Sequence, residues 1–289
     1  MPAFASILNI GQNVPNEEAI QLYFTTQSSD VGMALHDKTT DSNNPAIVQS
    51  SAADPPGNLV FSSQLASSMF MYFNAVFGFT KQLDPKSTKI DVSLVCPVYQ
   101  PLATTESTNT TIASCSSPDK TWVYYLSGVD QNSVRIVRSE IGKQVTSITL
   151  EVNDVRLGSS LAAYFDAKKQ HSFVIYQHEV EGDNSDVRQL YEYSVDEESS
   201  SRIQNTDDAA KLTSIAAVDF RQVTYLYYMN NDNELRVIRK EQGTWGSPAA
   251  VEAPNVNGSS QITVVSSGEA NHVFYTDQND SPVHLMLPY

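Results

Sequence analysis

A strand rich in aromatic residues recurs six times along this chain of 289 residues. The copies are Gln21–Phe24 (QLYF), Phe70–Phe73 (FMYF), Trp122–Tyr125 (WVYY), Phe173–Tyr176 (FVIY), Tyr225–Tyr228 (YLYY) and His272–Tyr275 (HVFY). By subtraction, their last residues lie 49, 52, 51, 52 and 47 positions apart. A period of about 50 residues with several short strands per unit is typical of β-propellers. The period predicts an all-β, six-bladed β-propeller, a single domain over residues 1–289.

Two further predicted strands flank each aromatic strand. A strand of small residues led by Ser or Thr precedes it, as in Ser159–Phe165 and Thr213–Phe220, and small residues suit the crowded centre of a propeller. After it come a turn rich in Asp, Asn, Ser or Gly and a third strand, which is clearest at Val134–Gly142 and Leu235–Gly243. The outer, fourth strand is the least distinct, with candidates at 147–152 and 249–251.

Two parts of the repeat depart from this pattern. In the second repeat, the Pro- and Thr-containing stretch Val98–Ser114 is expected to be an exposed loop. The last repeat stops on its third strand, so its outer strand is either missing or supplied by another segment. The sequence leaves ring closure open between these two.

The charge and the apolar runs bear on partners and location. A net charge of −15 argues against nucleic acid, whose phosphates need Lys and Arg, and against an anionic membrane surface. No run approaches the ~20 apolar residues of a membrane span, and the N-terminus lacks the basic region of a signal peptide. We therefore expect a cytoplasmic protein in which Cys96 and Cys115 are reduced, although their pairing is left open.

Motifs that would fix an enzyme class are absent from the sequence. There is no Gly-x-Ser-x-Gly elbow, HExxH motif, phosphate loop or dinucleotide fingerprint. The five histidines do not follow metal-ligand spacing, and surface or core positions are their simpler interpretation. The expectation is no metal and no cofactor.

The phrases S-I-A-A, Y-L-Y-Y-x-N-x-x-x-x-L and G-x-W-G in Thr213–Pro248 resemble the repeat of the fungal fucose-specific lectins, which are six-bladed propellers. In that family an Arg on the aromatic strand and a Glu on the third strand hold sugar hydroxyls between neighbouring blades. The Arg position here holds Gln21, Phe70, Trp122, Phe173, Tyr225 and His272. The Glu position holds Leu35, Val92, Ile136, Gln189, Val237 and Leu285. A one-residue slip restores Glu in single blades at most, as Glu192 or Glu234.

Loss of both ligand positions argues against the family's usual sugar, because each unpaired hydroxyl costs about 1–3 kcal/mol. The leading hypothesis is an apolar pocket for a hydrophobic small molecule. Similarity to lectin-like propellers of fungal secondary metabolism implies a cofactor-free cyclase, of the hetero-Diels–Alderase type that joins a quinone methide to a terpene. The alternatives are a fucose- or glycan-binding lectin with degenerate sites, and an interaction scaffold.

For this site we predict a ligand-binding set and a catalytic set. The ligand-binding residues are Phe70, Trp122, Phe173, Tyr225, Arg188 and Arg236. The catalytic hydrogen-bonding residues are His272, Tyr227 and Arg135. The competing interpretations are that the aromatic residues form the core between blades and that the arginines lie on a solvated strand face. The oligomeric state is open, with a homodimer as one option.

Overall fold

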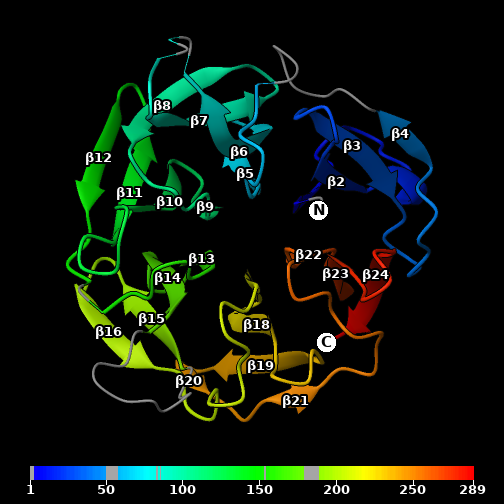
Figure 1. The fold of residues 1–289 in the computed structure, drawn as a ribbon. Coiled ribbons are helices and arrows are strands. Elements are labelled where there is room, and N and C mark those ends of the chain that lie inside the picture. The colour runs from blue at the N-terminus through cyan, green and yellow to red at the C-terminus, as the bar shows by residue number, and fades with distance from the viewer. Residues whose placement is uncertain (1–2, 50–57, 83, 85, 153, 179–188) are drawn as a thin grey trace.

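A computed structural model of the chain describes residues 3–49, 58–82, 84, 86–152, 154–178 and 189–289. Six antiparallel sheets stand around a central axis as the blades of a propeller (Figure 1). The predicted all-β, six-bladed propeller is confirmed. The one helical element in these described residues is the 3-10 turn η1 (Asn16–Glu18). Within the same residues, no helix is long and apolar enough to cross a membrane.

The blades follow one another in chain order, each built from consecutive strands. Blade 1 contains β1 (Phe4–Leu8), β2 (Ile20–Thr25), β3 (Val31–His36) and β4 (Ile47–Gln49). Blade 2 contains β5 (Ala66–Phe70), β6 (Phe73–Lys81), β7 (Ile90–Cys96) and β8 (Gln100–Thr105). Blade 3 contains β9 (Ile112–Ser116), β10 (Thr121–Ser127), β11 (Arg135–Ile141) and β12 (Val145–Thr149). Blade 4 contains β13 (Leu161–Asp166), β14 (His171–Gln177), β15 (Leu190–Ser194) and β16 (Ser199–Arg202). Blade 5 contains β17 (Ile215–Phe220), β18 (Val223–Met229), β19 (Leu235–Glu241), β20 (Thr244–Trp245) and β21 (Ala249–Ala250). Blade 6 contains β22 (Thr263–Ser266), β23 (Ala270–Thr276) and β24 (Pro282–Pro288).

The predicted order of strands within a repeat is confirmed in five blades. The strand of small residues is innermost, the aromatic strand is second and the third strand follows, all as antiparallel neighbours. In blade 5 the short β20 and β21 both pair with β19 as its outer partners. The predicted turn at 183–186 lies outside the described residues.

Blade 2 departs from the prediction in two places. Phe70–Phe73 is not one strand, because Met71 and Tyr72 form the tight turn between β5 and β6. The second strand of this blade is β6, in which Phe77 pairs with Ala66 as Tyr125 pairs with Ile112 in blade 3. The aromatic strand of this blade thus lies four residues later than predicted. The expected loop Val98–Ser114 is also wrong, since it contains β8, the outer strand of the blade, and the start of β9. Proline is tolerated in β8 because an edge strand has no further ladder to complete.

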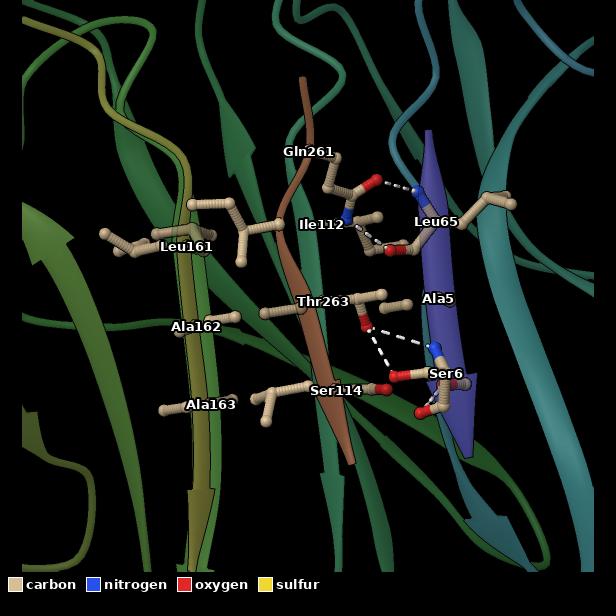
Figure 2. Close-up of a pocket in the computed structure, with 18 residues that line it drawn as sticks. Ala5, Ser6, Leu65, Ile112, Ser114, Leu161, Ala162, Ala163, Gln261 and Thr263 are labelled. Carbon is tan, nitrogen blue, oxygen red and sulfur yellow. Dashed lines mark hydrogen bonds between the residues drawn. The ribbon is translucent and has the colours of Figure 1, made fainter. Parts of the chain in front are cut away.

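The inner strands of all six blades line a central channel with a cavity of about 80 Å³ (Figure 2). Its walls are mostly Ala and Ser, such as Ala5, Ser6, Ala162 and Ala163, as predicted for the crowded centre. A cavity of this size is large enough for water molecules and is below the range of drug-sized ligand sites.

Hydrogen bonds from side chains of blade 6 close the ring, and no blade combines strands from the two ends of the chain. The Ser6 backbone N–H of β1 donates to Thr263 Oγ1 of β22 at 3.0 Å. Gln261 Oε1 accepts from the backbone N–H groups of Phe4 and Leu65, both at 3.1 Å, and its Nε2 donates to the Leu65 carbonyl at 2.7 Å. Gln261 thus ties blade 6 to blades 1 and 2 together, as Figure 2 shows for the Leu65 contacts. Within the described residues blade 6 has three strands, so its outer strand is missing and no other segment replaces it.

Hydrophobic cores fill the seams, which are the spaces between neighbouring blades. The core between blades 3 and 4 contains 16 buried residues, whereas the core between blades 6 and 1 contains six, on β1, β2, β3, β22 and β23. The seam between blades 6 and 1, on one side of the three-stranded blade, therefore has the fewest buried core residues. A poorly filled seam is where a cavity is expected.

The two cysteines, Cys96 on β7 and Cys115 on β9, are buried and unpaired. Burial raises the pKa of the Cys96 thiol to about 11 and that of Cys115 to about 12. Both thiols are protonated at neutral pH and are therefore poor nucleophiles.

Candidate functional site

A pocket of about 270 Å³ opens in the seam between blade 6 and blade 1. Most of its wall is apolar. The lining residues are Phe4, Leu22, Phe24, Ala34, His36, Asn43, Pro45, Val48, Phe274, Tyr275, Thr276, Asp280, Pro282, Val283 and His284. A concave, mainly apolar cavity with a few converging polar groups is the usual form of a small-molecule site.

Strand alternation presents these side chains to the pocket. Leu22 and Phe24 are two residues apart on β2, and Ala34 and His36 are two apart on β3, so each pair faces one side of its strand. Gly32, which pairs with Phe24, makes room for its ring: a Cβ at Gly32 would lie 2.5 Å from two carbons of that ring. A side chain at this position would push the Phe24 ring out of place.

Three histidines gather at one end of the pocket: His36 on β3, His272 on β23 and His284 on β24. His284 stacks on Phe274 with ring centres 4.3 Å apart, and His36 meets both rings edge-on. His284 Nδ1 lies 3.1 Å from the Ser42 carbonyl, which accepts only, so this nitrogen carries the proton. His284 Nε2 therefore accepts from His272 Nδ1 at 2.9 Å. The Asn43 side-chain oxygen also accepts from the His284 backbone N–H at 2.7 Å.

The histidine cluster is uncharged at neutral pH. Burial, followed by the proximity of His284, lowers the pKa of His36 and that of His272 to about 4. Burial also lowers the pKa of His284. Desolvation disfavours the charged imidazolium, so the pocket presents neutral rings to a ligand.

The clustering of His36, His272 and His284 could not be read from their spacing in sequence. Even so, no group of His, Cys, Asp or Glu in the part of the chain that the structure describes could hold a metal ion. Both ring nitrogens of His284 are engaged in hydrogen bonds within the protein. His36 and His284 therefore form part of the pocket wall, and the cluster connects blades 6 and 1.

The predicted aromatic ligand-binding residues lie in other seams. Trp122 is buried, stacks on Phe165 of blade 4 at 5.6 Å and donates from Nε1 to Glu140 at 3.1 Å. Phe173 is buried and stacks on Tyr164 at 5.0 Å. Half-buried Phe70 ends β5 and meets Phe73 edge-on.

Tyr225, Tyr227 and Arg135 also lie outside the wall of the 270 Å³ pocket. Tyr225 of blade 5 is buried beside Tyr289 of blade 6. Tyr227 is buried, and its hydroxyl accepts from Asn271 Nδ2 at 3.0 Å. Arg135 donates to the backbone carbonyls of two neighbours in its own turn.

Arg236 forms ion pairs with Asp208 at 3.5 Å and Glu234 at 3.1 Å. Arg188 lies outside the described residues. None of the predicted residues that the structure describes lines the 270 Å³ pocket, although His272 is hydrogen-bonded to the lining residue His284. The eight predicted residues that the structure describes are not brought together at one site.

The pocket residues of blades 1 and 6 were missed by sequence reasoning, although one signal pointed to them. Among the described residues the last repeat has no outer strand, and the seam between this repeat and the first has the fewest buried core residues. Phe24 and Phe274 are members of the aromatic strands at the two ends of the chain. A closed ring brings these ends together, and a missing strand leaves space between them.

No protein-family model and no curated protein sequence matches this chain. Its fold, however, matches solved structures of fungal lectins. The fucose-specific lectin of Aleuria aurantia aligns with a TM-score of 0.69 at 16% identity, over 99% of this chain and 91% of the lectin. AofleA of Arthrobotrys oligospora gives 0.64 at 14% identity over 100% and 83%. The SapL1 lectin, solved with α-methyl fucoside, gives 0.63 at 12% over 99% and 92%. The chain thus has the six-bladed propeller fold of these lectins.

Proposed function

We propose that the protein binds a small, uncharged and largely apolar molecule in the pocket between blades 6 and 1. The observation that carries this proposal is the composition of the wall. Phe4, Leu22, Phe24, Phe274 and Val283 surround a cavity of about 270 Å³. Burying apolar ligand surface against such a wall contributes about 25 cal/mol per Å² before the costs of association.

The polar groups of the pocket favour an uncharged ligand. His36 and His284 are neutral rings, so they provide no charge to pair with an anion. Asp280, the one carboxylate among the described lining residues, is exposed and accepts from Asn257 Nδ2 at 2.9 Å. A charged ligand would lose its hydration without gaining a buried counter-charge, which is unfavourable.

Glycan binding is the second candidate, and the fold comparisons favour it. The similar propellers include fucose-specific lectins and a lectin solved with α-methyl fucoside. The pocket also lies between neighbouring blades, where the lectin resemblance places sugar sites. Against this, the described wall holds no Arg or Glu, and both ring nitrogens of His284 and the side-chain oxygen of Asn43 are engaged within the protein. His36 Nδ1 is buried without a hydrogen-bond partner, so it is the one histidine nitrogen of the described wall shown to be open to a ligand hydroxyl.

A cofactor-free cycloaddition would require the pocket to hold two reactants at once. At about 270 Å³ the cavity is slightly below the 300–1,000 Å³ range of single drug-sized ligand sites. The volume therefore favours binding of one small molecule, and the cyclase expectation has no support in the pocket.

Val48 gives a direct test, because its side chain lines the pocket while the residue is 59% exposed. We expect Val48→Asp to weaken binding of 2-naphthol, a fluorescent and uncharged probe, by about tenfold or more, or about 1.4 kcal/mol. The cause is a carboxylate placed against the apolar face of the ligand. Fluorescence titration measures the dissociation constant.

Val98 provides the matched control, since it is 55% exposed and lies in blade 2 away from the pocket. Val98→Asp should leave the naphthol affinity within about twofold of the unsubstituted protein. Equal affinities for both Asp variants and the unsubstituted protein would place the ligand elsewhere.

A further inference from the structure

The seam between blades 5 and 6 contains a side chain of the protein in a ligand-like position. The ring of Tyr289 stacks on Phe220 of β17, with centres 4.8 Å apart and planes at 18°. It also packs against Tyr225 of β18 at 5.7 Å and 46°. Its hydroxyl contacts Ser266 and donates to the Ala270 carbonyl at 3.1 Å. Tyr289 is nevertheless 37% exposed, so it covers the two rings from the solvent side.

Two arginines flank this aromatic slot. The guanidinium of Arg239 lies 5.4 Å from the centre of the Tyr225 ring, and that of Arg221 lies 4.9 Å from the centre of the Phe220 ring. In the described ranges, neither has a carboxylate oxygen within 4.0 Å. Glu241, two residues beyond Arg239 on β19, acts electrostatically on Tyr225 but forms no such ion pair.

Neither arginine lacks a partner for want of carboxylates, because Asp and Glu outnumber Lys and Arg by 33 to 18 in the sequence. A guanidinium beside an aromatic ring recognises a planar ring through stacking and a carboxylate through charged hydrogen bonds. The slot thus offers two flat apolar faces and two cations at its edge.

We propose that this seam is a second ligand site, for an aromatic carboxylate, and that Tyr289 occupies it in this structure. A bound ligand would take the place of the Tyr289 ring on Phe220 and pair its carboxylate with Arg239. This site is separate from the pocket between blades 6 and 1, so each proposal stands or fails without the other.

The test compares the unsubstituted protein with Tyr289→Ala and the matched Tyr289→Phe, using 4-hydroxyphenylacetate as the probe in calorimetric titrations. Tyr289→Ala should bind it about tenfold more tightly than the other two proteins, because the competing ring is gone. Adding Arg239→Gln to Tyr289→Ala should weaken this binding about fivefold, yet change the affinity for uncharged 4-methylphenol by less than about twofold.

Equal affinities of Tyr289→Ala and the unsubstituted protein would overturn the proposal, as would an Arg239→Gln effect that is the same for both probes. Thermal unfolding checks that each variant is folded. If Tyr289→Ala does not fold, Tyr289→Leu keeps an apolar side chain on Phe220 without the stacked ring. Tyr289→Leu should then bind 4-hydroxyphenylacetate about threefold more tightly than the unsubstituted protein. An unchanged affinity in that variant would equally reject the site.

Discussion

Replacing Lys240 by Met should lower the free energy of unfolding by about 3–5 kcal/mol. Lys240 of blade 5 is buried, and its Nζ lies 2.6 Å from Glu192 Oε2 of blade 4. Lys240 Nζ also donates to the Tyr164 hydroxyl at 3.0 Å, while that hydroxyl donates to Glu192 Oε1 at 2.5 Å. Without Lys240, the buried Glu192 carboxylate loses the one cation that pairs with it in the described part of the chain, and the cost of its desolvation is no longer offset. Urea unfolding followed by fluorescence measures the change.

Two matched variants separate the buried charge from other effects. Lys89 pairs with Glu106 at 2.8 Å, but both side chains are at least half exposed, so Lys89→Met should lower the stability far less than Lys240→Met. The double variant Lys240→Met/Glu192→Leu should recover most of the lost stability, because it leaves no unpaired charge. A Lys240→Met cost no larger than that of Lys89→Met would show that the buried pair does not stabilise the seam.

Acidification from pH 6.5 to pH 4 should destabilise the protein through the histidine cluster. The pKa values of His36 and His272 are about 4 in the folded protein, against an ordinary value of 6.5. In this window the unfolded chain binds protons that the folded chain excludes, so the free energy of unfolding falls as the pH falls. One such histidine contributes about 3 kcal/mol to the free energy of unfolding, and this contribution is fully present above pH 6.5 and lost by pH 4.

The variant His36→Phe isolates this contribution. Phenylalanine keeps a ring against Phe274 and His284 but cannot be protonated. The carboxylates are common to both proteins, so their titration cancels in the difference between the two pH profiles. Between pH 7 and pH 4, we expect the free energy of unfolding of the unsubstituted protein to fall by about 3 kcal/mol more than that of His36→Phe. Parallel profiles from urea unfolding at each pH would contradict this account.

The period of aromatic strands was sufficient to predict the six blades, because each repeat buries the same strand in the same layer. The strand predicted from this period at Phe70–Phe73 was wrong, because the aromatic pattern there continues through a turn. Met71 and Tyr72 have φ values of 46° and 69° there, a region that side chains of this kind rarely adopt. Without Gly, Asn or Asp at these positions, nothing local in the sequence marked the turn.

The candidate site was less predictable, because it depends on how well each seam is filled. Trp122, Phe173 and Tyr225 occupy equivalent places in their repeats, and each is covered by a partner from the neighbouring blade. Those partners lie on other strands and follow no common spacing. Glu192 illustrates the point: the sequence marks it as a sugar-ligand position under a shifted alignment, whereas Lys240, 48 residues later, closes the seam around it.

The most direct test of the pocket between blades 6 and 1 is a titration of 2-naphthol into the protein, repeated in an excess of α-methyl fucoside. We expect one saturable site for naphthol, for which the sugar does not compete and at which Val48→Asp weakens binding by about tenfold or more. Absence of saturable naphthol binding, together with capture of fucosylated glycans that free fucose displaces, would contradict it and establish sugar binding instead.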